Sequence, residues 1–286
     1  MFIQKRTTLS NKEKAEVLDL LQACHDYDGT ASIPYLANDY NVDQDMPCLL
    51  LAYEKEQLVG CLYIYADELD DVSVSLFVLP FIRKQGIARA LEEELAQIVK
   101  AYHLSGISYE TERMFMEKNP WLLDAFHLVE EEDSELWLRR ARKPYELASR
   151  DNCEVSLADR DDIEEIAKLQ TAAFENDFEY SLQYALTSFE GEGTSLYVLK
   201  KSGHVIASVT IDQTSDYNHI FGLAVAPNHQ GQGFGKYLMK SAINQLLTQN
   251  ERDFQIVVEK ENIHAANLYR SLGFRDVTEV VYLKKG

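Results

Sequence analysis

The chain repeats itself once, with a period of about half its length. Residues 76–99 read LFVLPFIRKQGIARALEEELAQIV, and residues 223–246 read LAVAPNHQGQGFGKYLMKSAINQL. An offset of 147 residues aligns Gly233 with Gly86, and it also aligns the proline that follows the apolar run in each segment. A repeat of this length indicates two similar domains, because solenoids and propellers repeat every 20 to 50 residues. We therefore expect domains at 1–142 and 153–286, joined by a linker at 143–152.

The same offset relates the segments that precede the repeat. LAYEKEQLVGCLYIY (51–65) and VLKKSGHVIASVTI (198–211) both read as strand, polar turn and strand. Amphipathic helical patterns lie before each of them, and the first helix begins at a Ser10-x-x-Glu13 capping box. Each half then continues with a long helix, a strand, a shorter helix and a last strand. This order predicts an α/β fold with two tandem domains, each with a mixed, mostly antiparallel central sheet flanked by helices.

Composition narrows the class of protein. The 28 Lys and Arg residues against 47 Asp and Glu give a net charge of −19, which disfavours a protein that follows a phosphate backbone. Neither a signal peptide nor an apolar run of membrane-spanning length is evident. The four cysteines are far apart, without a CxxC pair, so neither disulfides nor a metal site are indicated. We expect a globular cytoplasmic protein with free thiols.

The segment HQGQGFG (229–235) lies between an expected strand ending near Ala226 and an expected helix at about 234–249. Glycines in such a position let a ligand approach the main chain, and the amides of a helix N-terminus attract phosphate. Two familiar phosphate loops do not match. A Walker loop has Gly where Gln230 stands and Ser or Thr where Tyr237 stands, and the dinucleotide fingerprint GxGxxG differs from GxGxG.

Gln230-Gly231-Gln232-Gly233-Phe234-Gly235 resembles the Q/R-x-x-G-x-G/A signature of the GNAT superfamily of N-acetyltransferases. Arg83-Lys84-Gln85-Gly86-Ile87-Ala88 is similar to it as well. In the second copy the chain continues as N-x-x-A-x-x-L-Y-x-x-x-G-F from Asn262 to Phe274, another element of the family. The resemblance covers nearly the whole chain as two tandem copies and implies that acetyl-CoA or a related acyl-CoA is bound.

The resemblance also implies roles for particular residues. The strand before the glycine loop would pair its main chain with the pantetheine arm, and the amide of Leu223 would polarise the thioester carbonyl. Tyr269 would donate a proton to the departing thiolate, and Asn262 would hold CoA or a water molecule while also capping its helix. The residues expected to contact the cofactor are Leu223, Ala224, Val225, Gln230, Gly231, Gln232, Gly233, Phe234, Gly235 and Asn262, with Arg83, Gly86 and Ala88 in the first copy.

The base that takes the amine proton has several candidates. His219 lies six residues before Val225, where some members of the family carry a glutamate, and imidazole titrates near neutrality. Glu259 and Glu261, after the next expected strand, are alternatives, and a chain of water molecules is another.

The first copy departs from the family pattern where chemistry is expected. Counting seven residues from Asn119 leads to Phe126 instead of a tyrosine, Glu130-Glu131 stands in place of Gly-Phe, and Val72 stands in place of His219. We therefore expect one catalytic half, the second, and a partner half.

The acceptor is the least determined part. Acidic and aromatic residues in FENDFEYSLQYAL (174–186) would suit a cationic amine, although they are equally compatible with a solvated helix face. Three hypotheses remain: an N-acetyltransferase acting on a primary amine of a small molecule or peptide, a non-catalytic acyl-CoA-binding regulator, and a structural or partner-binding protein. The oligomeric state is not indicated.

Overall fold

The computed structural model describes all residues, 1–286, and the chain forms two compact units. Unit 1 comprises residues 1–136, 259–261 and 277–286, and unit 2 comprises 137–258 and 262–276. A division of the chain at a single linker would give two continuous domains, whereas each of these units consists of separate stretches of the chain. The boundaries 1–142, 143–152 and 153–286 stay a prediction.

Unit 1 contains the strands and helices of the first copy together with the last strand of the chain. Its elements are β1 (Phe2–Arg6), α1 (Asn11–Asp28), β2 (Leu49–Glu54), β3 (Gln57–Tyr65), β4 (Val72–Val78), η1 (Pro80–Ile82), α2 (Ile87–Ala101), β5 (Ile107–Glu112), α3 (Arg113–Lys118), α4 (Trp121–Phe126), most of β6 (Leu128–Arg140) and most of β12 (Arg275–Lys285). The strand order is β1-β2-β3-β4-β5-β12-β6, and β12 pairs antiparallel with β5.

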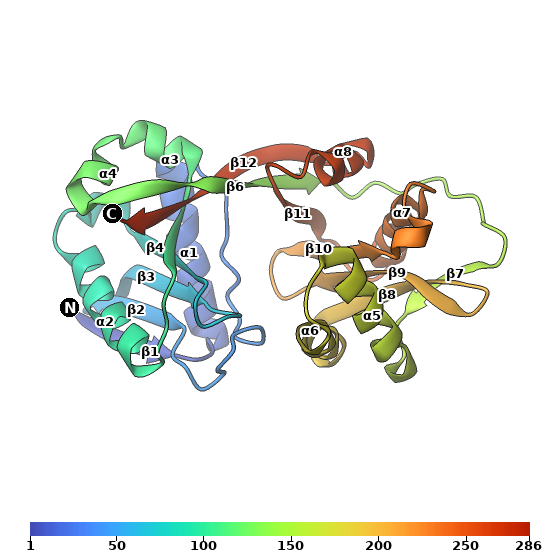
Figure 1. Cartoon of the computed structure of the whole chain (residues 1–286). Helices are drawn as coiled ribbons and strands as arrows, with labels where there is room; N and C mark the ends of the chain where they lie inside the picture. Colours follow the sequence, from blue (N-terminus) through green and yellow to red (C-terminus); the bar gives the residue numbers. More distant parts are fainter. The chain divides into compact units, whose positions relative to one another are not determined.

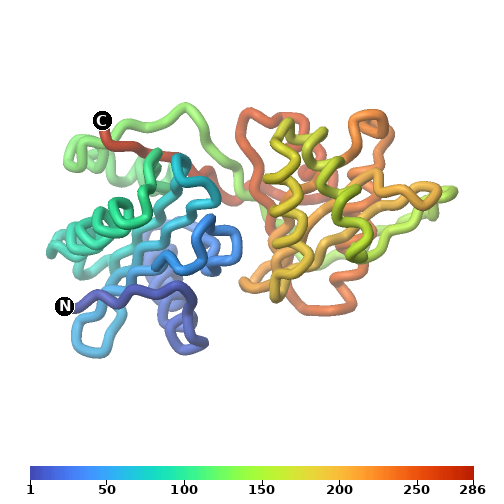
Figure 2. Tube along the Cα trace, turned by 60° about the horizontal axis from the view of Figure 1, so that its bottom comes forward, coloured from blue at the N-terminus to red at the C-terminus, as the bar shows by residue number.

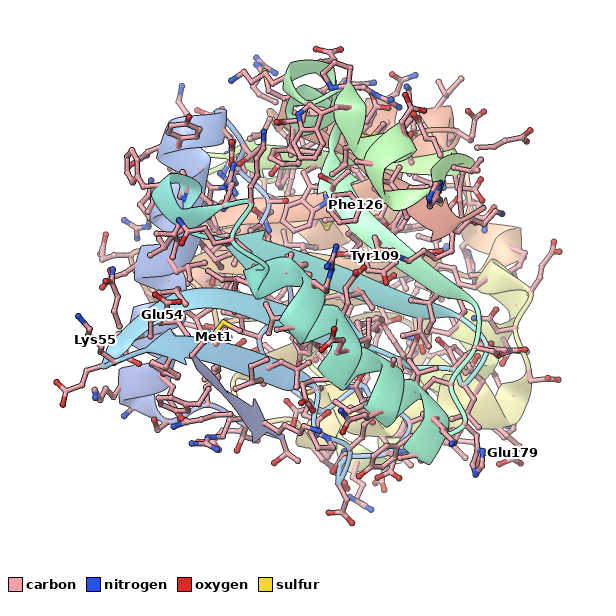
Figure 3. All side chains as sticks on the ribbon, turned by 90° about the vertical axis from the view of Figure 1, so that its left-hand side faces the viewer. Met1, Glu54, Lys55, Tyr109, Phe126 and Glu179 are labelled. Atoms are coloured by element: carbon pink, nitrogen blue, oxygen red, sulfur yellow. The ribbon has the colours of Figure 1, made fainter.

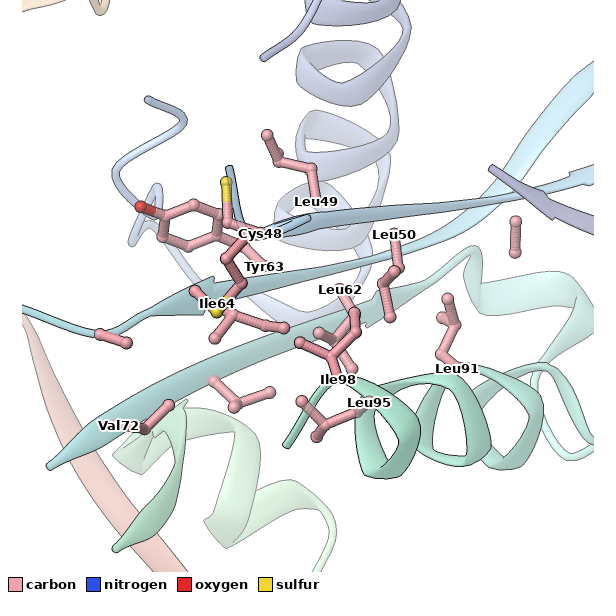
Figure 4. Packing of buried hydrophobic residues seen from close by; sticks show 14 of the residues in the cluster. Cys48, Leu49, Leu50, Leu62, Tyr63, Ile64, Val72, Leu91, Leu95 and Ile98 are labelled. Atoms are coloured by element: carbon pink, nitrogen blue, oxygen red, sulfur yellow. The ribbon is translucent and has the colours of Figure 1, made fainter. Parts of the chain in front are cut away.

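The core of unit 1 lies between buried, apolar strands and the apolar sides of two helices. Strands β2 and β3 are almost continuously apolar and buried, as expected for a sheet covered on both faces. Helix α1 packs on one face and α2 on the other (Figure 2). In α2, Leu91, Leu95 and Ile98 recur at helical spacing and contact Leu50 and Leu62 of the sheet (Figure 4). In Figure 3, α2 crosses in front of the strands, and Glu54 and Lys55 mark the β2–β3 turn at one edge.

Unit 2 repeats this arrangement, with two helices between its first two strands where unit 1 has α1 alone. Its elements are β7 (Cys153–Leu157), η2 (Arg160–Asp162), α5 (Ile163–Phe174), α6 (Phe178–Glu190), β8 (Thr194–Lys201), β9 (His204–Asp212), β10 (Tyr217–Val225), η3 (Pro227–His229), α7 (Phe234–Leu246), β11 (Asp253–Glu259) and α8 (Ile263–Ser271). The strand order is β11-β10-β9-β8-β7, in which only the β10–β11 pair is parallel. Helices α5 and α6 cover one face of β8–β10 and α7 the other (Figure 1).

These features confirm the predicted fold class, a pair of α/β domains with mixed, mostly antiparallel sheets. The predicted capping box is also present, since the Ser10 hydroxyl accepts from the Glu13 amide and the Glu13 carboxylate accepts from the Ser10 amide. None of the helices combines the length and apolar character needed to cross a bilayer.

Candidate functional site

Strand β10 changes its register with β9 in the middle of the strand, and its pairing with β11 ends near the same point. Pairing with β9 shifts between Phe221 and Ala224, at a β-bulge that contains Gly222 with a φ of +61°. Parallel pairing with β11 ends at Ile220. On the side of β10 that faces β11, the main chain of Leu223 and Val225 therefore lies beyond the paired residues, where it can pair with another extended chain.

The glycine loop follows directly and needs glycine for two different reasons. Gly231 and Gly233 adopt φ angles of +70° and +77°, and Gly233 starts α7 without a side-chain cap. The first amides of α7 have no intrahelical acceptor, so together with the helix dipole they are suited to binding an anion. At Gly235 glycine is needed because space is lacking: an added Cβ would lie 3.2 Å from Val225 Cγ2. The start of α7 thus packs against β10.

Polar side chains hold this loop in shape. The Gln230 side-chain amide donates to the Val225 carbonyl at 3.0 Å, and that of Gln232 donates to the Asn228 carbonyl at 3.1 Å. These bonds tie the loop to the end of β10 without using the main-chain amides of Gly231 to Gly235. The two glutamines support the loop conformation through their side chains.

Arg150, from the predicted linker, lies beside the loop and was not predicted as a site residue. Its Nη2 donates to the Gln232 carbonyl at 2.9 Å, its guanidinium lies 4.5 Å from the centroid of the Phe234 ring, and its Nη1 is buried without a partner. A Cβ at Gly233 would be 3.9 Å from Nη2. No local pattern signals this residue, because only the fold brings it to the loop.

Helix α8 carries the predicted acid. Asn262 is the N-cap, and its side chain accepts from the Ala265 amide at 3.0 Å, which confirms its capping role. Tyr269 is buried, with 7% of its surface exposed, and its ring contacts Phe274 edge-on at 6.3 Å. Burial raises the pKa of Tyr269 to about 12. Its phenol is therefore protonated at neutral pH and able to donate.

His219 lies on β10 before the bulge, between two aromatic rings. Its ring centroid is 6.4 Å from that of Trp137 and 5.9 Å from that of Phe221, and its Nδ1 is 3.2 Å from Gln255 Nε2. Desolvation lowers the pKa of His219, while the negative charge of Asp212 opposes this effect. The ring is thus held in its neutral form. Its role as a base stays a prediction.

The two glutamates proposed as alternative bases, Glu259 and Glu261, are both exposed, and their segment groups with unit 1.

In the stretch 174–186, considered above for a cationic acceptor, the aromatic and the acidic residues lie in different surroundings. Tyr184 of α6 lies over the bulge, with its Cε1 at 3.6 Å from a Cβ built at Gly222, and its ring contacts those of Tyr180 and Phe221. The acidic residues of the same stretch are exposed: Glu175, Asp177 and Glu179. Aromatic rings, rather than carboxylates, therefore line β10 at the bulge.

A glycine loop at a helix start is found in both the sequence pattern and the structure, and the structure adds the bulge and the early end of the β11 pairing in the strand before it. The model of the acetyltransferase (GNAT) family matches residues 14–114 and 160–274, which together make up more than half of the chain. The chain belongs to this family.

Similar curated proteins carry acetyltransferase names. The [ribosomal protein bS18]-alanine N-acetyltransferase of Haemophilus ducreyi is 32% identical over 94 residues, which are 32% of this chain and 65% of that protein. The protein of the same name from Escherichia coli K12 is 31% identical over 91 residues, 32% of this chain and 62% of its own length. The match thus spans less than two thirds of these relatives.

Solved structures share the fold over the full length. A GCN5-related N-acetyltransferase from Sphaerobacter thermophilus has a TM-score of 0.71 at 15% identity, covering 99% of this chain and 95% of its own. A tandem GNAT protein from the clavulanic acid biosynthesis pathway has the same TM-score and identity, with 99% and 98% covered. At this level of identity the likeness shows the tandem fold alone.

The corresponding loop of unit 1 (83–88) also begins a helix at a glycine of positive φ, but the strand before it and its side-chain contacts differ. Gly86 starts α2 with a φ of +88°, as Gly233 starts α7. Strand β4 pairs with β3 in one uninterrupted register, so the bulge is missing. Ala88, which aligns with Gly235, is partly buried against the core of the unit.

The arginine of the unit 1 loop points inward. Arg83 donates through Nε to the Val78 carbonyl at 2.9 Å, as Gln230 does to Val225, and through both Nη atoms to the Asp28 carboxylate at 2.8 and 2.6 Å. All its donor nitrogens are engaged within the unit. The predicted contacts of Arg83, Gly86 and Ala88 with a cofactor stay predictions, and this geometry gives Arg83 a structural function.

Proposed function

We propose that unit 2 transfers an acetyl group from acetyl-CoA to a primary amine. The observation that carries the proposal is the combination of the bulge at Gly222, the end of the β11 pairing at Ile220, and the uncapped amides that start at Gly233. The released edge of β10 suits an extended pantetheine chain, and the loop suits the pyrophosphate. Arg150 adds a positive charge beside it in a chain of net charge −19.

The reaction joins the amine nitrogen to the acetyl carbon and breaks the carbon–sulfur bond. The Leu223 amide would stabilise the negative charge that develops on the carbonyl oxygen. Tyr269 would give its proton to the CoA sulfur as it leaves, so that CoA departs as a thiol. The amine loses its extra proton to a base, for which a water molecule, His219, Glu259 and Glu261 are the candidates. The products are an amide and free CoA, and Tyr269 is reprotonated from solvent.

The acceptor is a small molecule or a peptide. Relatives named for an alanine of a ribosomal protein favour a peptide amine, whereas the exposed carboxylates of Glu175, Asp177 and Glu179 would attract a small cationic amine. Unit 1 would complete the fold without turnover. We expect a cytoplasmic protein that binds neither nucleic acid nor a membrane. The alternative is an acyl-CoA-binding regulator without turnover.

The experiment that tests the proposal is a calorimetric titration of the full chain with acetyl-CoA. It compares the wild type with Gly233→Glu and with the matched variant Gly86→Glu, since each introduces a carboxylate at a glycine of positive φ that starts a helix. Binding that only Gly233→Glu abolishes supports the proposal. Binding that only Gly86→Glu abolishes, or no binding and no thermal stabilisation of the wild type, refutes it.

A further inference from the structure

A row of polar side chains crosses the sheet of unit 2 on one face. His219 of β10 is opposite Asp212 of β9 and opposite Gln255 of β11 in the strand register. Directly opposed residues in neighbouring strands point to the same side of the sheet. Arg139 of β6 continues the row, with its Nε at 2.8 Å from Gln255 Oε1.

Arg139 determines the orientation of the Gln255 amide. A guanidinium has donors and no acceptor, so the atom that faces it must be the amide oxygen. The amide nitrogen then faces His219 Nδ1, at 3.2 Å. The guanidinium of Arg139 is itself held in place, because it lies 4.3 Å from the centroid of the Tyr217 ring.

An amide N–H can only be donated, so the Nδ1 atom must accept it with its lone pair. The imidazole is then neutral and carries its proton on Nε2. We infer that Arg139 and Gln255 are positioning residues that hold His219 as an Nε2–H donor and occupy the nitrogen with which it would act as a base. Among the candidate bases, this arrangement disfavours His219 itself.

The charged groups around the ring are compatible with this state. On β9, Asp212 is the carboxylate that faces His219, but both of its oxygens accept from Thr214, from the amide at 2.8 Å and from the hydroxyl at 3.0 Å. Arg139 on β6 is linked to the ring through Gln255. The charge of Asp212 favours a protonated ring, but desolvation outweighs it and lowers the pKa of His219.

The consequence for the acceptor rests on the proposed function. His219 shares its face of the sheet with Phe221, which contacts Tyr184 at the bulge. An N–H at this position would recognise an acceptor that has an oxygen near its amine, as the first carbonyl group of a peptide does. A simple alkylamine has no group for this donor.

The test is a long-range ¹H–¹⁵N correlation spectrum of the histidine rings in the full-length protein at pH 7. The His219 signals are assigned among the 7 histidines by their loss in His219→Asn. We expect an unprotonated Nδ1 and a protonated Nε2. A protonated Nδ1, or rapid exchange between the two tautomers, would overturn the inference. This spectrum needs neither cofactor nor acceptor, so its outcome is separate from that of the acetyl-CoA titration.

A pair of variants tests the positioning. Gln255→Glu replaces the donor with an anionic acceptor and should move the proton to Nδ1 and raise the titration midpoint of His219 by about one to three pH units. Gln255→Met is the control of similar size, which should leave both tautomers populated. An unchanged tautomer and midpoint in folded Gln255→Glu would show that the row does not control the ring.

Discussion

The ion pair between Arg83 and Asp28 makes a quantitative prediction about unit 1. The Asp28 side chain is only 7% exposed and that of Arg83 25%, and two nearly parallel hydrogen bonds join them. The rings of Tyr27 and Phe115 lie 5.8 and 5.6 Å from the guanidinium carbon. Removal of one partner from such a pair leaves a buried charge without compensation, which costs about 3–5 kcal/mol.

The informative substitution is Arg83→Gln. Glutamine is the residue that the second copy has at this position, where it donates to the Val225 carbonyl, so it can preserve the bond to Val78 while removing the charge. With a urea m value of about 2 kcal/mol/M, the unfolding midpoint should fall by roughly 1.5–2.5 M. Unfolding of unit 1 can be followed by the fluorescence of Trp121 in a Trp137→Phe background, since the chain has 2 tryptophans.

The control is the double variant Asp28→Asn with Arg83→Gln. It removes both charges and should recover most of the lost stability, because no unpaired carboxylate remains. A cost below about 1 kcal/mol for Arg83→Gln alone would mean that solvent or another cation compensates Asp28, and the reasoning from burial would fail.

Three further predictions concern other parts of the chain. Tyr269→Phe should lower kcat about 100-fold and leave the calorimetric affinity for acetyl-CoA unchanged; an equal loss of affinity would assign Tyr269 to binding. In the wild type, kcat should show no decrease from deprotonation of Tyr269 at pH values below its pKa of about 12. Burial raises the pKa values of the thiols of Cys24, Cys48 and Cys61, so iodoacetamide should label only the partly exposed Cys153 in the native protein, as mass spectrometry can show. Deletion of residues 277–286 removes three buried side chains of β12, worth about 5–8 kcal/mol, and should unfold unit 1, so that Trp121 loses its native fluorescence in the Trp137→Phe background. Trp137 of unit 2 should keep its native fluorescence in a Trp121→Phe background, and native fluorescence of both would contradict the assignment of β12.

The sequence by itself determined the features that depend on neighbouring residues. The repeat predicted two domains of one fold, the Ser10–Glu13 spacing predicted the start of α1, and the glycines at 231 and 233 indicated a loop open to a ligand before a helix. Such features are visible in a sequence because capping, helical periodicity and φ preferences act over a few residues. The family signature belongs to the same category.

Only the tertiary structure decided which distant residues meet. It placed β12 beside β5 in unit 1, Arg83 on Asp28, Arg150 beside the glycine loop, and Gln255 between Arg139 and His219. A carboxylate or an amide has the same appearance in a sequence whatever it contacts. The charge, tautomer and accessibility of these side chains depend on partners brought together by folding, and no pattern of neighbouring residues in the sequence contains those partners.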